Sequence, residues 1–194
     1  ASDVYKRQEE QEEQEEWERY LGGIRETLVR AVERRLLTDE DIEIGFYLSG
    51  GLDSSLICAI ASRLLYPKKI RTFSIGFEGS TDLPYAKKVA EYIGSIHTEI
   101  KITEEEALKI IPDVIYTTCT YDITTIRASC GQYLISKYVK ENTNIKVIIN
   151  GDGSDEVLGG YIFNYYAPNE KEFDNACKEL TKEIHLYDCR RLDR

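Results

Sequence analysis

The stretch Ile44-Gly45-Phe46-Tyr47-Leu48-Ser49-Gly50-Gly51-Leu52-Asp53-Ser54-Ser55 decides the fold of this chain. It begins with an apolar run, continues through two adjacent glycines, and leads into an amphipathic run over residues 56–65. This order predicts a β-strand, a tight turn and a helix. Such a turn presents backbone N–H groups beside a helix N-terminus, which together suit a phosphate or pyrophosphate group.

The side chains of the turn indicate the same chemistry. Gly50 and Gly51 allow the backbone to approach an anion closely, and the serines add hydroxyl donors. Asp53 would repel a phosphate unless Mg²⁺ lay between them. An ordinary capped turn also fits these residues, since Asp and Ser favour helix N-termini, and the G-x-x-x-x-G-K-[ST] pattern is not present. We interpret the turn as a site for metal-bound nucleotide phosphates.

Strands and helices alternate through the rest of the chain. Apolar patterning predicts strands over 44–48, 70–77, 97–102 and 145–149, and helices over 24–36, 56–65, 82–93 and 129–140. Thr103 and Glu106 form a capping box for a further helix. Strands separated by helices predict an α/β fold, with a parallel sheet covered by helices on both faces.

A second glycine-rich turn, Asn150-Gly-Asp-Gly-Ser-Asp-Glu-Val-Leu-Gly-Gly160, follows the last predicted strand. It carries three carboxylates, those of Asp152, Asp155 and Glu156. A lone acidic turn is usually only a solvated loop. In open α/β sheets, however, ligands bind beyond the carboxyl ends of the strands, so this turn is a candidate for metal binding or proton transfer.

Composition narrows the classes of protein. The chain has 194 residues and a net charge of −10, much of it from glutamates between positions 9 and 18. No basic patch indicates nucleic-acid binding, and no apolar run is long enough for a membrane span. Five cysteines without a C-x-x-C pair favour reduced thiols in the cytoplasm, with Cys58 packed in a core. With two histidines there is little for a zinc site, and His97 is expected to be structural.

The chain divides into two parts. The segment from Ala1 to Arg7 resembles translated adapter sequence and is not expected to be part of the fold. Residues 1–21 as a whole form a leader and acidic Glu/Gln-rich segment, expected to be disordered or helical. Residues 22–194 are expected to form one domain that is incomplete at its C-terminus.

Four motifs carry a resemblance to a known family. The Ser-Gly-Gly-Leu-Asp-Ser run resembles the pyrophosphate loop of the N-type ATP pyrophosphatases. Together with residues 121–129, 150–161 and 187–190, it resembles the synthetase domain of glutamine-hydrolysing (class B) asparagine synthetases, from about Gly22 to Arg194. The resemblance implies the fold of the N-type ATP pyrophosphatases, also described as adenine nucleotide alpha hydrolase-like.

The same resemblance implies a reaction. It is the ATP-dependent amidation of L-aspartate to L-asparagine through β-aspartyl-AMP, with release of AMP and pyrophosphate and with ATP and Mg²⁺ at the site. Ammonia would come from glutamine in an N-terminal glutaminase domain, and a C-terminal part would supply a lysine. We expect this chain to lack both parts, and the full-length protein to be a cytoplasmic enzyme that can form a homodimer.

The resemblance also implies roles for individual residues. Those expected to bind the nucleotide are Leu48, Ser49, Gly50, Gly51, Asp53, Ser54, Ile75, Asn150 and Gly151, with Leu48 and Ile75 acting through their backbone groups. Those expected to hold Mg²⁺ are Asp53 and Asp155. Those expected to act on aspartate or its adenylate are Thr124, Arg127 and Asp152. Taken alone, Arg127 fits a surface salt bridge equally well.

Position 152 departs from the family, which usually has glutamate there and serine at position 150. A carboxylate persists, one methylene shorter, and a displacement of about 1 Å can cost about a hundredfold in rate.

Alternative functions remain open. They are another ATP pyrophosphatase such as a β-lactam synthetase-like enzyme, an RNA thiolation or lysidine enzyme, which would be expected to show basic patches or paired cysteines, and a non-catalytic nucleotide-binding fragment.

Overall fold

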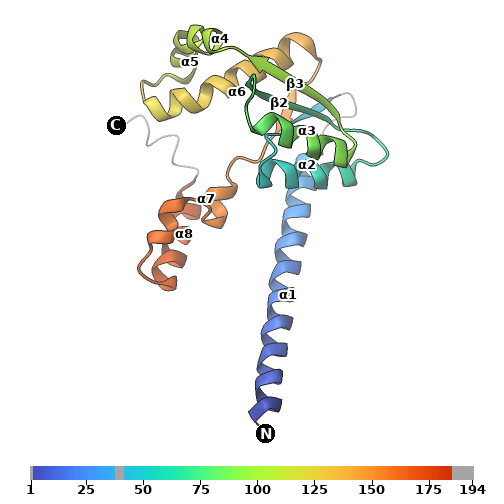
Figure 1. The fold of residues 1–194 in the computed structure, drawn as a ribbon, viewed down its shortest axis with the longest axis vertical. Coiled ribbons are helices and arrows are strands. Elements are labelled where there is room, and N and C mark those ends of the chain that lie inside the picture. The colour runs from blue at the N-terminus through green and yellow to red at the C-terminus, as the bar shows by residue number, and fades with distance from the viewer. Residues whose placement is uncertain (1, 38–41, 185–194) are drawn as a thin grey trace.

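The computed structural model describes residues 2–37 and 42–184, and Figure 1 shows their arrangement. The elements are, in order, α1 (Ser2–Arg35), β1 (Ile44–Tyr47), α2 (Leu52–Leu64), β2 (Arg71–Phe77), α3 (Asp82–Ile93), β3 (Ile96–Ile102), α4 (Glu104–Lys109), α5 (Ile111–Thr118), α6 (Ile123–Asn142), β4 (Val147–Ile149), α7 (Ser154–Leu158), the 3₁₀ helix η1 (Ile162–Tyr166) and α8 (Glu170–Glu183). The motif at 187–190 lies outside the described residues.

The four strands form one parallel sheet in the order β3-β2-β1-β4. Phe46 of β1 pairs with Thr72 of β2 on one side and with Ile149 of β4 on the other. The chain therefore adds β2 and β3 to one side of β1 and returns to place β4 on the opposite side. This reversal of strand order makes a topological switch point between β1 and β4, where open α/β sheets bind ligands.

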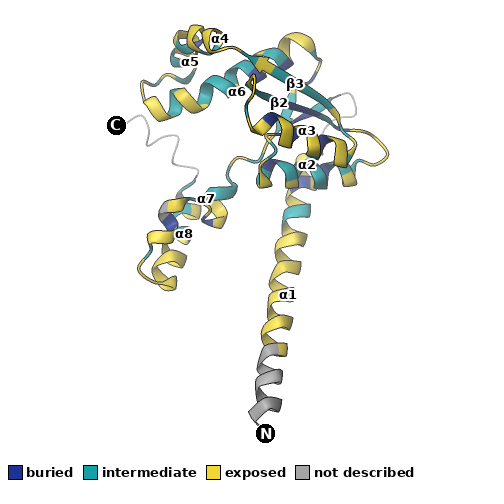
Figure 2. Ribbon diagram, viewed as in Figure 1, coloured by how far each residue is buried: buried dark blue, intermediate teal, exposed yellow. Residues whose placement is uncertain are grey.

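Helices cover both faces of the sheet, as the alternating pattern predicts. On one face Phe46 is fully buried in a cluster with Val32 of α1, with α2 through Cys58, and with α3 through Ala90. On the other face Phe73 is packed against α6. Figure 2 shows the buried residues gathered between the sheet and these helices. The expected parallel α/β class is confirmed.

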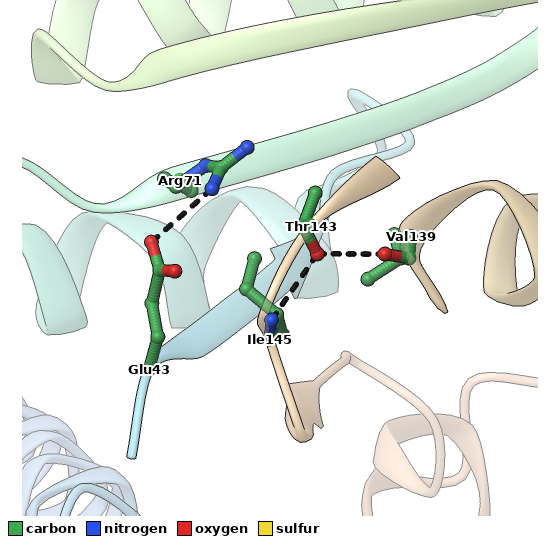
Figure 3. Close-up of polar contacts among 5 residues, drawn as sticks. All are labelled: Glu43, Arg71, Val139, Thr143 and Ile145. Atoms are coloured by element: carbon green, nitrogen blue, oxygen red, sulfur yellow. Dashed lines mark hydrogen bonds and ion pairs between the residues drawn. The ribbon is translucent and has the colours of Figure 1, made fainter. Parts of the chain in front are cut away.

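Polar contacts at the amino ends of the strands fix how the chain enters the sheet (Figure 3). Arg71 at the start of β2 pairs with Glu43 just before β1, at 3.3 Å. The Thr143 hydroxyl donates to the carbonyl oxygen of Val139 at 2.7 Å and accepts the N–H of Ile145 at 3.2 Å. These bonds close the end of α6 and direct the chain into β4 at the amino ends of the strands, away from the carboxyl ends where ligands bind.

The predicted elements are recovered with changes at their ends. The capping box at Thr103 is present, and α3 ends at Gly94 in a left-handed conformation with φ +67°. Helix α6 begins well before the predicted start at 129, because the Asp122 carboxylate accepts the N–H of Thr125 at 2.8 Å and caps it.

The first helix is longer than the pattern at 24–36 predicts, since α1 extends through the acidic segment back to Ser2. It projects away from the sheet, and its C-terminal end is the part packed in the core (Figures 1 and 2). Trp17 is 66% exposed, whereas Val32 is 3% exposed. No helix in the described part of the chain is long and apolar enough to cross a membrane.

Candidate functional site

The turn between β1 and α2 is held together by its own serines. The hydroxyls of Ser49 and Ser54 lie 2.9 Å apart, the N–H of Gly51 donates to Ser49 Oγ at 3.2 Å, and Ser54 Oγ donates to the carbonyl oxygen of Gly51 at 3.3 Å. Ser54 is buried. These two hydroxyls therefore fix the shape of the turn as well as line the cleft beside it.

The N-terminus of α2 is available to an anion. Gly51 is the N-cap and, within the described residues, no side chain caps the helix. The N–H groups of the first turn have no partner inside a helix, and they carry the positive end of the helix dipole. Since α2 starts directly at the mouth of the turn, the backbone can offer these donors to a phosphate or pyrophosphate.

Gly50 is required by packing against α3. Its φ is +85°, which side chains rarely adopt, and a Cβ there would lie 2.5 Å from the backbone nitrogen of Ala86. The turn is thereby pressed against the start of α3. Gly50 does not line the cleft, so its glycine is explained by the fold rather than by close approach to an anion.

Gly151 brings the second glycine-rich turn against the first. A Cβ on Gly151 would lie 2.7 Å from the backbone nitrogen of Ser54 and 3.1 Å from the Cβ of Asp53. The turn after β4 therefore touches the N-terminus of α2, at the switch point of the sheet. Two turns that are a hundred residues apart in the sequence form one wall.

The two turns line a cleft of about 1650 Å³. Eleven of the residues expected at the site from the sequence lie in its wall: Leu48, Ser49, Gly51, Asp53, Ser54, Ile75, Thr124, Asn150, Gly151, Asp152 and Asp155. The cleft is larger than a typical small-molecule pocket of about 300–1,000 Å³. It has room for a nucleotide together with a second substrate.

Arg127 does not line the cleft. It is exposed on α6, one turn beyond Thr124, and it forms no ion pair with any described residue. The surface salt bridge is therefore not formed with a described residue, and the action of Arg127 on aspartate or its adenylate stays a prediction.

The three carboxylates of the second turn have different surroundings. Asp152 Oδ2 accepts the side-chain N–H of Asn150 at 2.6 Å and that of Gln132 at 3.4 Å, whereas Glu156 accepts the hydroxyl of Tyr161. No group of three His, Cys, Asp or Glu side chains among the described residues is placed to hold a metal ion. The three carboxylates of this turn therefore do not form a metal site by themselves, and its role in metal binding or proton transfer stays a prediction.

A Mg²⁺ ion that is already bound to phosphates needs fewer ligands from the protein. Such an ion usually keeps several waters and binds one or two carboxylates besides the phosphate oxygens. Asp53 and Asp155 both line the cleft, on the two turns that meet at the switch point. This donor set fits a phosphate-bound Mg²⁺ and does not form a site for the ion alone.

The wall on the side of α6 contains residues for which no individual role was expected, although residues 121–129 are one of the four motifs. It comes from the segment before α6 and from α6 itself, and includes Thr120, Tyr121, Asp122, Thr125 and Gln132. The turn leading into α6 is closed by the Asp122 cap and by the N–H of Asp122 donating to the Thr120 hydroxyl at 3.1 Å. An Asp three residues before a Thr was the available sequence signal, as a helix N-cap.

Two titratable groups that do not line the cleft have shifted pKa values. Burial lowers the pKa of His97, although nearby Glu99 opposes that shift, and the ring bonds Thr72 Oγ1 at 2.9 Å and Ser74 Oγ at 3.1 Å. Burial raises the pKa of the Cys58 thiol to about 12, so it stays protonated and unreactive. These contacts agree with a structural His97 and a packed Cys58.

Comparison with known proteins adds a family match. Residues 23–189 match the family described as "Asparagine synthase". The chain is 48% identical over 172 residues to a probable glutamine-hydrolysing asparagine synthetase of Acanthamoeba polyphaga mimivirus, covering 88% of this chain and 31% of that protein. It is 43% identical over 195 residues to the asparagine synthetase of Rattus norvegicus, covering 98% of this chain and 34% of that protein. The chain thus spans about a third of the length of these relatives.

Solved structures give a more distant likeness. An NH₃-dependent NAD synthetase from Campylobacter jejuni aligns at a TM-score of 0.49 and 16% identity, covering 87% of this chain and 76% of that one. An NMN synthetase from Francisella tularensis aligns at 0.47 and 14%, covering 80% and 68%.

Proposed function

The chain belongs to the asparagine synthase family, and from this premise we propose that it forms the ATP- and aspartate-binding part of an enzyme that makes asparagine. The aspartate side-chain carboxylate attacks the α-phosphorus of ATP, forming β-aspartyl-AMP and releasing pyrophosphate. Ammonia then attacks the activated carbonyl carbon, and AMP leaves with one oxygen of the original carboxylate. Asparagine, AMP and pyrophosphate are the products.

The observation that carries this proposal is the meeting of two turns at the switch point. A Cβ on Gly151 would lie 2.7 Å from the nitrogen of Ser54, so the turn after β4 lies directly on the uncapped N-terminus of α2. One wall therefore combines backbone donors for pyrophosphate with the carboxylates of Asp152 and Asp155. Adenylation needs donors that stabilise the charge developing on the leaving pyrophosphate. It also needs polar groups that hold the second substrate beside the nucleotide.

Each part of the cleft has a proposed task. Backbone groups of Leu48 and Ile75 hold the adenosine, and the first turn of α2 binds the pyrophosphate. Asn150 and Gly151 close the nucleotide site from the other side. Asp53 and Asp155 would hold Mg²⁺, which supplies charge neutralisation on the phosphates when bound.

The aspartate side of the cleft is assigned to α6 and to the second turn. Thr124 lies in the cleft wall near the start of α6, where its hydroxyl can donate to a substrate carboxylate. Arg127 follows at the i+3 position and would act from the rim of the cleft. Asp152 of the second turn lies in the same cleft wall and accepts a hydrogen bond from Gln132 of α6, and its carboxylate would act on aspartate or its adenylate.

The wider organisation is part of the proposal. Residues 22–194 would form the synthetase domain, with a glutaminase domain and a C-terminal part in the full-length protein. Family members of about three times this length support that organisation. We propose a cytoplasmic location, which the free cysteines of the described residues favour, and a homodimer as the assembly.

The proposal is tested with Asp53→Ala in the full-length protein. Pyrophosphate release from ATP is measured with and without aspartate. We expect aspartate-dependent release in the unchanged protein and a loss of about a hundredfold or more in the variant, since removing one group that stabilises developing charge costs that much. Asp82→Ala is the matched control, because Asp82 also lies in the first turn of a helix but not in the cleft.

Undiminished release in Asp53→Ala would refute the assignment of the turn. Release with other carboxylates but not with aspartate would instead favour a relative such as a β-lactam synthetase-like enzyme. Nucleotide binding without release for any carboxylate would identify a non-catalytic nucleotide-binding module.

A further inference from the structure

Asp152 is held from two sides through one oxygen. Asn150 Nδ2 donates to Asp152 Oδ2 at 2.6 Å from within the same turn, and Gln132 Nε2 donates to the same oxygen at 3.4 Å from α6. Asp152 Oδ1 accepts no hydrogen bond from the described residues. The carboxylate is exposed, so without these amides it would rotate freely in the cleft.

The two amides differ in what they can fix. Asn150 belongs to the turn that carries Asp152, so it sets the local conformation alone and moves with the turn. Gln132 belongs to α6, which is anchored by Ile135 at 4% exposure and Val139 at 3%, both in the cluster with Phe73. Because Ile135 is one turn along the helix from Gln132, the position of the amide is tied to the core of the fold.

We propose that Gln132 is a positioning residue that holds the Asp152 carboxylate by Oδ2 and leaves Oδ1 to face the substrate. This inference rests on the proposed function, in which Asp152 acts on aspartate or its adenylate. The side chain of aspartate is one methylene shorter than that of glutamate, so it reaches less far and gains more from a fixed direction, which the amide of Gln132 provides from α6.

The effect on kcat of removing the Gln132 amide should therefore depend on which residue occupies position 152. In the native background, Gln132→Met removes the donor and keeps the length of the side chain, and we expect kcat to fall about tenfold with the KM for ATP unchanged. A hydrogen bond to a charged group, weakened by its 3.4 Å length, corresponds to an effect of that size. In an Asp152→Glu background, the longer carboxylate no longer depends on this amide, and the same change should cost less than about twofold.

The experiment is a four-member kinetic cycle in the full-length protein, comprising the unchanged protein, Gln132→Met, Asp152→Glu and the double variant. Aspartate-dependent pyrophosphate release gives kcat and KM, and thermal unfolding is followed in parallel. Lys137→Met, an exposed change further along α6, controls for altering the surface of that helix. Gln132→Lys keeps a donor and should recover part of the loss.

The outcomes distinguish the positioning role of Gln132 from the proposed synthesis of asparagine. A loss confined to the Asp152 background, without a matching fall in Tm, supports the positioning role. Equal losses in both backgrounds, or no loss in either, would overturn it while leaving asparagine synthesis intact. If the unchanged protein shows no aspartate-dependent release, the proposed function fails, and the positioning role fails with it.

Discussion

Gly151→Ala tests whether the two glycine-rich turns act as one wall. Its added methyl group would lie 2.7 Å from the backbone nitrogen of Ser54 and 3.0 Å from the carbonyl carbon of Asp53. Ordinary contact begins at about 3.4 Å, so the turn and α2 must separate by about 0.7 Å. The neighbours are backbone atoms, which cannot rotate out of the way as a side chain could. The methyl group also covers an N–H proposed to bind pyrophosphate.

The expected size of the effect follows from that displacement. A misplacement of 1 Å costs about a hundredfold in rate, so we expect kcat/KM for pyrophosphate release to fall between about tenfold and a hundredfold. Forcing a methyl group into a close contact costs about 1–3 kcal/mol of unfolding free energy. Release assays and urea unfolding of the full-length protein measure the two quantities.

Gly23→Ala is the matched control for this change. Gly23 lies in α1, where a Cβ would meet nothing within 4 Å, so the same substitution should leave pyrophosphate release unchanged. If Gly151→Ala retains the unchanged rate and unfolding free energy, the two turns are not in contact.

Three further predictions concern packing and titration. Gly50→Ala would place a Cβ at a φ of +85° and 2.5 Å from the backbone nitrogen of Ala86, so it should lower the unfolding free energy by about 2–5 kcal/mol. Urea unfolding measures this loss, and a loss below about 1 kcal/mol would contradict the packing against α3. The pKa of His97 is lowered from 6.5 by burial, so the unfolded chain binds the proton first and stability should fall as the pH drops below 6.5. His97→Gln should flatten that dependence in unfolding curves at pH 7.5 and 5.5, and an unchanged slope would count against it. Cys58, with a pKa of about 12, should resist iodoacetamide at pH 8 in the folded protein, whereas the exposed Cys119 should react. Mass spectrometry of the labelled peptides measures both reactions, and fast labelling of Cys58 would contradict its burial.

The regular elements were predictable because their signals are local. The strand at 44–48 combines apolar residues with glycines at its end, and the capping box at Thr103 joins residues three apart. The start of α6 was predicted too late, since apolar periodicity is weak over its first turns and the deciding signal is the single cap at Asp122. The strand order β3-β2-β1-β4 has no local signal, because packing across the whole sheet decides it.

The sequence predicted which residues gather at the cleft, but not all the packing reasons that place them there. Most expected residues line the cleft because the carboxyl ends of parallel strands meet at one edge. Gly50 was interpreted as making room for an anion, yet the contact it permits is with α3, far along the sequence. Arg127 lies outside the wall, and Gln132 inside it, because the rotation of α6 about its axis is set by Ile135 and Val139 packing on Phe73.

The most direct test of the proposed function follows an oxygen atom. The full-length protein is given ATP, ammonia and aspartate labelled with ¹⁸O in its side-chain carboxylate, and the products are examined by mass spectrometry. If the carboxylate attacks the α-phosphorus, one ¹⁸O atom appears in AMP and the pyrophosphate is unlabelled. Formation of ADP with labelled inorganic phosphate, or of unlabelled AMP, would contradict synthesis through β-aspartyl-AMP.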